Sequence, residues 1–508
     1  MSLKKNVIAN FLGQGWVAVM GIAFVPAYIK YLGIEAYGLI GIFALLQVWL
    51  NLLDMGMTPA LSREMARFKG GTHNAQSIRD LLRSIELIGV CIALLVAVAI
   101  WLASDWLASD WLNVKKMPIH SVAQACALMG IVAALRFIEN IYRSSIVGLE
   151  KQVILNVVTI AIATLRGLGA VGILVWVSPT IHAFFIWQAI ISALSVAILI
   201  PILYKALPAS QTIGRFSWVA ISQIWRYAAG IMLITLLSFL LMQTDKILLS
   251  RLLTLEHFGY YTLASLVANS LQMLAGPVDI AFFPRFTEQS SRNDQSSLIS
   301  TFHLGAQLIT VLVGAAAIEL IVFGDILLNL WTQNVVLAKT IAPLLAILSL
   351  GTLFNAFMHM PYQLQLAHGW TRLTIYVNTI AVLLLVPVIF FVAPRYGAVG
   401  VAWVWVLLNA SYVLFAVQIM FKRLLTTEKL QWYKDDIAKP LLAAIATALL
   451  IRWITPNNLG MLGQFLVLFF SSISLLITTA LTAPLVNQYI KHYVEKTLKY
   501  RFVGKFYK

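Results

Sequence analysis

Residues 164–172 read TLRGLGAVG and lie in the middle of a mostly apolar run from residue 153 to residue 177. The segment contains G-x-G-x-x-G, which opens a dinucleotide-binding helix only after a short buried strand and with an acidic residue about twenty positions later. Here the run is long enough to cross a bilayer as one helix, and the chain about twenty positions on reads FFIWQAI, with no acidic residue. The run therefore predicts a membrane helix whose glycines let neighbouring helices approach closely. Arg166 is left without an explanation.

The composition of the whole chain also indicates a membrane protein. Of its 508 residues, 60% are hydrophobic and 11% are charged, whereas soluble domains carry about 25% charged residues. Cys91 and Cys126 both fall in predicted helices, which argues against a disulfide framework or a thiolate metal site. The chain has no H-E-x-x-H, nucleophile elbow or P-loop, and no long external loop. We therefore expect a protein that is not an enzyme and has no cofactor.

Apolar runs of about twenty residues each predict a membrane-spanning helix. We expect an all-α polytopic membrane protein of about fourteen such helices, at residues 6–29, 37–60, 84–106, 118–142, 153–177, 182–204, 224–244, 258–283, 303–324, 338–362, 374–393, 397–421, 438–455 and 462–486.

The distribution of basic residues predicts the orientation of these helices. An even number of helices places both termini on the same side of the membrane, and most Lys and Arg residues fall on that side, including the 62–83 loop, the 422–439 loop and the tail. Cytoplasmic loops carry an excess of Lys and Arg, so both termini are expected in the cytoplasm. The net charge of +16 follows from this topology, and nucleic-acid binding is not needed to explain it.

An internal repeat predicts the domain organisation. LGIEAYG at residues 32–38 aligns with LTLEHFG at 253–259, an offset of 221 residues that also pairs Gly148 with Gly369 and Lys151 with Arg372. Each half then holds six helices, which makes the halves parallel and related by an axis along the membrane normal, as in rocking transporters. We expect a six-helix lobe at 1–222, a second at 223–424, and two extra helices with a basic cytoplasmic tail at 425–508.

Charged residues at bilayer depth are costly and usually face a cavity or a partner. In the first half, Arg136, Glu139 and Arg143 share one face of a helix, and Arg166 lies near the centre of the next. At the repeat offset, Arg136, Glu139 and Arg166 correspond to Phe357, Met360 and Pro387. The duplicated scaffold therefore does not require these charges, and they indicate a cationic cavity for an anionic substrate, since Arg binds phosphate or carboxylate with two hydrogen bonds.

These charges give two sets of candidate site residues. The candidates for substrate binding are Arg166, Arg136, Arg143, Arg63 and Arg452, and those for binding a coupling H⁺ or Na⁺ are Asp54, Glu139, Asp279 and Glu319. We expect Gly167 and Gly169 to leave room for Arg166 to reach the cavity. Structural alternatives stay open: Arg143 and Arg452 extend to the interface, Arg136 and Glu139 join helices, or Arg166 pairs with Glu139 or Asp54 only to stabilise the fold.

The chain also resembles a known family. With NFLGQG in its first helix, PAYIKYLGIEAYG at the exit of that helix and LDMGMTPALSREMAR closing the second, it is similar to the polysaccharide transport family. These are the Wzx-type lipid-linked oligosaccharide flippases of the multidrug/oligosaccharidyl-lipid/polysaccharide (MOP) superfamily. The resemblance covers the first twelve helices and implies a V-shaped pair of six-helix bundles around a cationic cavity. Many family members stop at twelve helices, whereas the related lipid II flippases also have fourteen and use the last pair to line a groove for the lipid tail.

The resemblance implies a function in the bacterial cytoplasmic (inner) membrane. The cargo would be an undecaprenyl-diphosphate-linked oligosaccharide, such as an O-antigen or exopolysaccharide repeat unit, moved from the cytoplasmic to the periplasmic leaflet by alternating access. The expected partners are this glycan, membrane lipids, a polysaccharide polymerase and assembly proteins, with no nucleic acid. Without a P-loop, the energy would come from an ion gradient or from consumption of the cargo. The alternatives are a cation-coupled drug exporter, a lipid II flippase and a polytopic polysaccharide polymerase.

Overall fold

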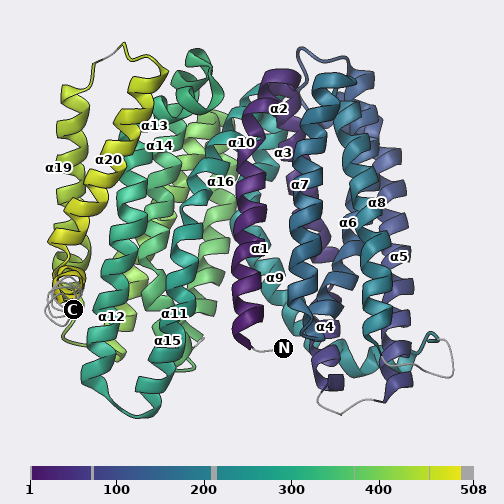
Figure 1. The fold of residues 1–508 in the computed structure, drawn as a ribbon, viewed down its shortest axis with the longest axis horizontal. Coiled ribbons are helices and arrows are strands. Elements are labelled where there is room, and N and C mark those ends of the chain that lie inside the picture. The colour runs from purple at the N-terminus through teal and green to yellow at the C-terminus, as the bar shows by residue number, and fades with distance from the viewer. Residues whose placement is uncertain (1–2, 70–73, 208–213, 371, 457, 493–508) are drawn as a thin grey trace, which may run out of the picture. The chain divides into compact units, whose positions relative to one another are not determined.

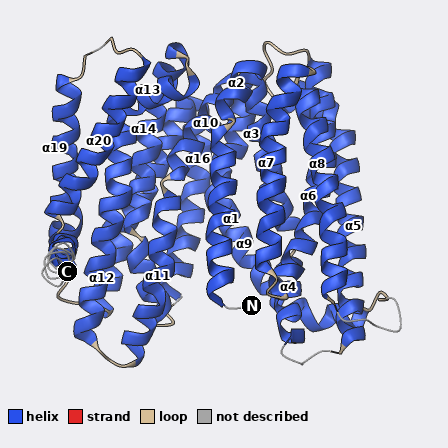
Figure 2. Cartoon of the chain, viewed as in Figure 1, coloured by secondary structure: helices blue, strands red, loops and turns tan. Residues whose placement is uncertain are grey.

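The structure is a computed structural model that describes residues 3–69, 74–207, 214–370, 372–456 and 458–492. These residues form helices joined by loops and turns, and no named strand occurs among them (Figures 1 and 2). Two backbone segments meet in an isolated parallel bridge between Asn113 and Thr254. The expected all-α class is confirmed.

The chain divides into two compact units, Met1–Gly259 and Tyr260–Lys508. The first unit includes α9 because this helix packs against α3, α4 and α5. The expected lobe boundary at 222/223 was drawn from the internal repeat, whereas the two units are defined by packing. The boundaries at 222/223 and 424/425 therefore remain predictions.

The helices of the first unit begin where polar side chains can cap them. Asn74, Thr180 and Ser217 each accept a hydrogen bond from a backbone N–H in the first turn of the helix that follows, which satisfies a donor that the helix leaves unpaired. The elements of this unit are α1 (Leu3–Ala23), α2 (Val25–Leu32), α3 (Ile34–Leu53), α4 (Met57–Lys69), α5 (Ala75–Trp106), η1 (Leu107–Trp111), α6 (Ile119–Gly148), α7 (Gln152–Trp176), α8 (Ile181–Ala206), α9 (Trp218–Leu252) and the start of α10 (Leu255–Ser270).

The second unit is built in the same way, with Asp294 and Asn334 as capping residues. After the rest of α10 it contains α11 (Gln272–Ser291), α12 (Gln295–Ile309), η2 (Thr310–Gly314), α13 (Ala315–Thr332), α14 (Val335–Phe357), α15 (His359–Ala367), α16 (Arg372–Ser411), η3 (Tyr412–Ala416), α17 (Val417–Arg423), α18 (Lys429–Gln431), η4 (Trp432–Ala438), α19 (Lys439–Ile454) and α20 (Met461–Thr482).

The number of membrane crossings agrees with the expectation of about fourteen. Among the described residues, 11 helices are long and apolar enough to span a bilayer. The longest, Arg372–Arg423, is broken at Gly397, whose φ of 55° is outside the helical range, so it supplies two of the expected crossings. The shorter apolar helix Ile34–Leu50 and the 35-residue α9 supply the others.

The two repeat motifs form the starts of α3 and α10, and each packs against the other. A Cβ atom on Gly38 would collide with the carbonyl oxygen of Leu255, and one on Gly259 would collide with the carbonyl oxygen of Ile34. Residues 34 and 255 are equivalent at the offset of 221, as are residues 38 and 259, so the contact is reciprocal. Only glycine allows the two backbones to approach this closely.

The repeat-related acidic residues Glu35 and Glu256 hold the same segment between α5 and α6. Glu35, which is buried, accepts hydrogen bonds from the backbone N–H groups of Lys115 at 2.7 Å and Lys116 at 3.0 Å. Glu256 forms an ion pair with Nζ of Lys116 at 2.5 Å. This half-exposed pair raises the pKa of Lys116 through its hydrogen bond to Glu256.

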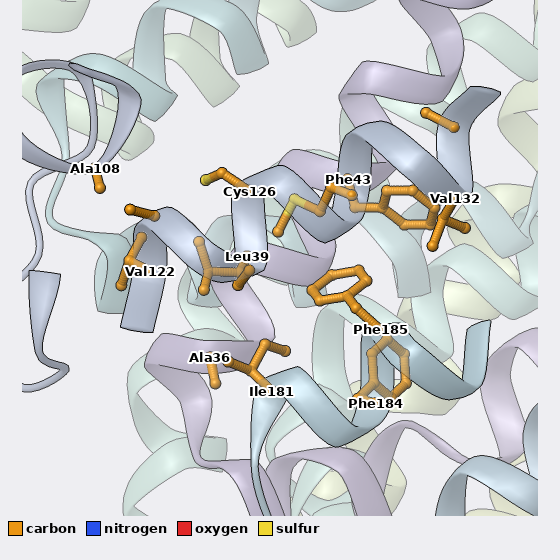
Figure 3. Packing of buried hydrophobic residues seen from close by; sticks show 14 of the residues in the cluster. Ala36, Leu39, Phe43, Ala108, Val122, Cys126, Val132, Ile181, Phe184 and Phe185 are labelled. Atoms are coloured by element: carbon orange, nitrogen blue, oxygen red, sulfur yellow. The ribbon is translucent and has the colours of Figure 1, made fainter. Parts of the chain in front are cut away.

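A core of buried side chains from α3, α5, α6, α7 and α8 holds the first unit together (Figure 3). Its aromatic centre is Phe43, whose ring meets Phe185 edge-on at 5.3 Å between centroids, while Phe185 meets Phe184 at 5.2 Å. Cys126 is buried in the same core, whereas Cys91 of α5 is exposed. This core fixes α6 and α7, the helices that carry Arg136, Glu139, Arg143 and Arg166.

Candidate functional site

The first unit contains a cavity of about 450 Å³ between residues of α1, α3, α6 and α7. The charged residues that line it are Arg136, Glu139 and Arg143 of α6 and Arg166 of α7. The sequence singled out the same four residues as intramembrane charges. The structure brings them together at one site.

Helical periodicity explains why these residues share one cavity. On α6, residues 136, 139, 140 and 143 follow the spacing of a single helix face, and on α7 the same holds for residues 159, 162, 163 and 166. Each set extends over two turns, about 10 Å of helix axis. The cavity is therefore bordered by one polar face of α6 and one mixed face of α7, with the apolar Val17 of α1 completing one wall.

Glu139 is the shared partner of two arginines. Its Oε1 lies 3.4 Å from Nη1 of Arg143, and its Oε2 lies 3.6 Å from Nη2 of Arg166. The side chain of Glu139 is 6% exposed, whereas those of Arg143 and Arg166 are 35% and 24% exposed. The carboxylate is thus enclosed, and both guanidinium groups keep access to the cavity.

Arg136 is held by groups that carry no charge. Its Nη2 donates a hydrogen bond to Oε1 of Gln188 at 3.1 Å, and its guanidinium lies 5.0 Å from the ring centroid of Phe43. Phe43 belongs to the aromatic core, so a rigid surface fixes the position of this charge. Neither Phe43 nor Gln188 was predicted from the sequence, because an apolar residue and an amide in a helix give no signal of their own.

The site carries more positive than negative charge. Three arginines face one carboxylate, which leaves two positive charges in the cavity lining. The Nε groups of Arg136 and Arg166 are buried and have no hydrogen-bond partner among the described residues. Because an unpaired buried donor is unfavourable, the arrangement is suited to an anion that accepts these hydrogen bonds.

The glycines beside Arg166 have a different role from the one expected. A Cβ atom on Gly167 would collide with the ring of Phe24, and one on Gly169 would collide with the ring of Trp187. Trp187 also donates a hydrogen bond from Nε1 to the carbonyl oxygen of Leu165 at 3.1 Å. The expectation that these glycines leave room for the arginine is wrong. They admit aromatic rings from neighbouring helices, in agreement with the first interpretation of TLRGLGAVG as a helix that packs closely.

Asp54 and Arg63 lie outside the cavity lining. The carboxylate of Asp54 accepts hydrogen bonds from the backbone N–H of Thr58 at 3.1 Å and from the Thr58 hydroxyl at 2.9 Å, so it caps the start of α4. Arg63 lies on α4 with its side chain 48% exposed, 3.9 Å from Glu64. These contacts are sufficient to explain Asp54 as a structural residue.

The candidate carboxylates of the second unit, Asp279 and Glu319, have partners that the sequence did not reveal. Asp279 Oδ2 lies 2.6 Å from Nδ1 of His359, and Glu319 Oε1 accepts a hydrogen bond from the Ser471 hydroxyl at 2.6 Å. The second oxygens of Asp279 and Glu319 are buried and have no hydrogen-bond partner among the described residues.

Arg452 of α19, the remaining candidate in the second unit, pairs with Asp325 of α13. Its Nη2 lies 2.7 Å from Asp325 Oδ2, and both side chains are about one-third exposed. The guanidinium also lies 5.9 Å from the ring centroid of Phe323. Arg452 therefore has a partner on a neighbouring helix within the second unit.

Comparison with known proteins places this fold in a family. The family model described as polysaccharide biosynthesis protein matches residues 3–290, more than half of the chain. A proposed O-antigen transporter from Shigella flexneri is 21% identical over 411 residues, which cover 80% of this chain and 94% of that protein.

Solved structures share the fold at low sequence identity. The lipid II flippase MurJ in an inward closed conformation aligns with a TM-score of 0.68 and 13% identity, over 94% of this chain and 98% of that chain. An inward-facing multidrug resistance transporter of the MATE family, from the MOP superfamily, aligns with a TM-score of 0.64 and 13% identity, over 81% of this chain and 96% of that chain. The chain therefore belongs to the polysaccharide biosynthesis protein family and has the helical membrane fold of the MOP superfamily.

Proposed function

We propose that the protein is a flippase for a lipid-linked glycan. Its cargo would be an oligosaccharide joined to undecaprenol through a diphosphate, moved from the cytoplasmic to the periplasmic leaflet of the inner membrane by alternating access. The observation that carries this proposal is the cavity of the first unit, in which Arg136, Arg143 and Arg166 face a single carboxylate. The O-antigen transporter proposed in Shigella flexneri supports a glycan cargo.

The chemistry of the cavity selects the charged part of this cargo. A guanidinium group can give two parallel hydrogen bonds to the oxygens of a phosphate group. Within a cavity at membrane depth these bonds are stronger than in water, because the surrounding dielectric is low. A cationic drug would meet two surplus positive charges in the same place. The site therefore favours a diphosphate over the cationic substrates of a drug exporter.

An ion gradient is the energy source that we infer, and Asp279 is the carboxylate best placed to respond to it. Asp54 caps a helix, Glu139 is shared between two arginines, and Glu319 is paired, within the described part of the chain, with a neutral hydroxyl and not with a second titratable group. Asp279 lies against an imidazole, and its other oxygen has no hydrogen-bond partner among the described residues. A carboxylate–imidazole pair can take up and release one proton, or accept a Na⁺ ion on its free oxygen.

Transport measurements test the cargo proposal. In cells that lack the gene, the wild-type protein should restore surface polysaccharide, whereas Arg136→Ala and Arg166→Ala should reduce it by about tenfold or more, because removing a buried charge contact costs about 2–5 kcal/mol of binding. Arg292→Ala is the matched control, since this arginine is 73% exposed and pairs with Glu288 outside the cavity. Normal surface polysaccharide in folded Arg136→Ala and Arg166→Ala variants contradicts the proposal.

The coupling proposal has a separate test. Asp279→Asn keeps the shape of the side chain but cannot take up the proton or hold a cation with a full charge. Transport into vesicles by this variant should no longer depend on an imposed pH or Na⁺ gradient. Asp325→Asn is a control in the same unit, because Asp325 is held by Arg452. Gradient dependence equal to that of the wild type in Asp279→Asn assigns coupling to another residue.

A further inference from the structure

The cavity of the first unit contains uncharged polar groups that its arginines do not use. The amide nitrogen Nε2 of Gln47 and the hydroxyl oxygen Oγ1 of Thr159 are both buried, and neither has a hydrogen-bond partner among the described residues. Both residues line the same cavity, as does the amide of Asn140, which is exposed. The neutral polar groups therefore come from three different helices, α3, α6 and α7.

Thr159 departs from the usual behaviour of threonine in this protein. Within helices a threonine hydroxyl commonly donates to the carbonyl oxygen four residues earlier. Thr164, on the same helix, donates to Ile160 at 2.8 Å, and Thr352 in the second unit donates to Leu348 at 3.0 Å. The hydroxyl of Thr159 makes no such bond, although the residue is only 8% exposed. Its hydroxyl is thus available to a molecule inside the cavity.

Leaving these groups unpaired has an energetic cost. A buried polar group without a partner costs about 1–3 kcal/mol. Water in the cavity can satisfy it in the empty state, and a ligand that displaces this water must replace the hydrogen bonds or lose affinity. A lipid tail offers no such bonds. A second phosphate would need additional cations, which Gln47, Asn140 and Thr159 do not supply.

The size of the cavity leaves room beside the anion. A volume of about 450 Å³ corresponds to on the order of fifteen water molecules at about 30 Å³ each. It also lies within the range of about 300–1,000 Å³ typical of small-molecule sites. A diphosphate bound by Arg136 and Arg166 fills only part of this space. The group covalently next to the diphosphate is the one that reaches the remaining part.

We propose that Gln47, Asn140 and Thr159 form a subsite for the first sugar, the residue bonded directly to the diphosphate. Sugar hydroxyl and acetamido groups both donate and accept hydrogen bonds, which matches an amide donor, a hydroxyl and a second amide. This inference rests on the proposed function, because it assigns the neutral part of the same cargo. The arginines provide affinity for any diphosphate, and the subsite selects among the sugars attached to it.

Binding of two probes to the purified full-length protein tests the subsite. The first probe is the methyl ester of farnesyl diphosphate, a diester without a sugar, and the second is farnesyl diphosphate carrying one N-acetylglucosamine, so that both probes have one negative charge on each phosphate. We expect the wild-type protein to bind the second probe more tightly. Thr159→Val and Gln47→Leu, which keep side-chain volume, should each weaken binding of the sugar probe by about five- to tenfold, the loss of one hydrogen bond of about 1 kcal/mol or more. Binding of the sugar-free methyl ester should change less than twofold.

Matched variants separate a sugar contact from a general effect on the fold. Thr159→Ser keeps the hydroxyl and should restore binding of the sugar probe. Thr352→Val removes a buried hydroxyl that already has its partner in Leu348, and it should leave binding of both probes unchanged. Arg166→Ala should weaken binding of both probes, because it removes a guanidinium group that contacts the diphosphate.

The possible results distinguish this inference from the proposed function. The sugar subsite is overturned if Thr159→Val and Gln47→Leu weaken binding of both probes equally. It is also overturned if the wild-type protein binds the two probes with equal affinity. Either result leaves the diphosphate site intact. A wild-type protein that binds neither probe overturns both. The subsite is established if Thr159→Val and Gln47→Leu weaken binding of the sugar probe alone and Thr159→Ser restores that binding.

Discussion

At the scale of single residues, Glu139 controls the charge of the cavity. It is the enclosed partner of Arg143 and Arg166, and without it three arginines would face one another. Its position explains how a cationic cavity can exist at membrane depth, because charged groups there are tolerated when they pair or face water. The pairing of Arg166 with Glu139 was one of the structural alternatives, and the structure shows this contact together with access of Arg166 to the cavity. The two roles are therefore compatible in one residue.

Neutralising Glu139 should affect stability and anion binding in opposite directions. In Glu139→Gln the arginines lose their common partner, and we expect a loss of about 1–3 kcal/mol in the free energy of unfolding, reduced by the partial exposure of both arginines. The additional positive charge should strengthen binding of farnesyl diphosphate. Thermal melting and a binding titration on the same sample measure the two effects.

The control for this change is Glu288→Gln, whose side chain is 57% exposed and pairs with an exposed arginine. Exposed pairs contribute about 1 kcal/mol or less, so its melting temperature should remain close to that of the wild type. If the two variants melt alike, Glu139 is not a stabilising partner of the arginines.

The geometry of Arg166 should matter as much as its charge. Lys in its place keeps the charge but loses the planar group that binds phosphate through two hydrogen bonds. We expect Arg166→Lys to retain the melting temperature and to transport several-fold more slowly than the wild type, with Arg166→Ala slower still. Transport measured together with melting separates this result from a purely structural role, in which activity would fall only in step with stability.

At the scale of the helices, the second unit anchors its last two helices through a buried polar network. His303 of α12 lies 2.5 Å from Asp436 of η4 through Nδ1 and 3.1 Å from Glu428 through Nε2. Gln307 donates to Asp436 at 2.8 Å and accepts from the backbone N–H of Leu485 at 2.8 Å, just beyond α20. The segments that begin α19 and follow α20 are thereby joined to α12. This network explains how the two additional helices pack on the unit.

Breaking this network should destabilise the second unit. His303 and Asp436 are 1% and 0% exposed, so His303→Leu removes the histidine partner of a buried carboxylate and leaves it only the hydrogen bond from Gln307 among those described above. The expected loss is on the order of 3 kcal/mol in the free energy of unfolding. His120→Leu is the control, because that histidine is exposed at the start of α6. Equal melting temperatures for the two variants would falsify the anchoring role.

The helices could be predicted from sequence to a large extent, because bilayer thickness fixes the length of each apolar run. The break at Gly397 coincides with the expected gap between residues 393 and 397, since a positive φ and nearby Pro394 interrupt the helix. Among the charge partners on other helices, the contact of Arg166 with Glu139 was one of the alternatives drawn from the sequence, and the others were not predicted. Asp325 lies one residue beyond the expected span 303–324, so the expected spans offer no intramembrane partner for Arg452 at this position. Pairs such as Arg452 with Asp325, far apart in sequence, depend on packing that a single sequence does not reveal.

The repeat-related glutamates should differ in their contribution to stability. Glu35→Gln removes a buried charge that accepts two backbone hydrogen bonds, so we expect a loss of about 1.5–3 kcal/mol. Glu256→Gln breaks a half-exposed ion pair with Lys116, and its effect should stay below about 1 kcal/mol. Melting of the two purified variants measures the difference. A larger effect for Glu256→Gln contradicts the roles seen for the two residues.

At the scale of the whole molecule, orientation in the membrane remains a prediction from the basic loops. Ala66 on α4 and Gln488 beyond α20 are exposed and should face the cytoplasm, whereas Lys115 should face the periplasm. In a variant without Cys91 and Cys126, Lys115→Cys should react with an impermeant maleimide in intact cells. Ala66→Cys and Gln488→Cys should react only after permeabilisation. Labelling of Ala66→Cys in intact cells would reverse the orientation.

In the proposed transport cycle, the two surplus positive charges of the cavity should make transport sensitive to membrane voltage. A diphosphate diester carries one negative charge on each phosphate, so the occupied cavity is nearly neutral and the field acts on it weakly. The empty cavity is not neutral. Each charge that crosses the full field is worth about 2.3 kcal/mol per 100 mV, so the interior-negative potential of a bacterium would draw the empty carrier back toward the cytoplasm. Valinomycin-clamped vesicles should therefore transport faster at cytoplasm-negative voltage, and Arg143→Gln, with one charge fewer, should show a weaker dependence. The voltage across the membrane would then reset the carrier without acting on the cargo itself.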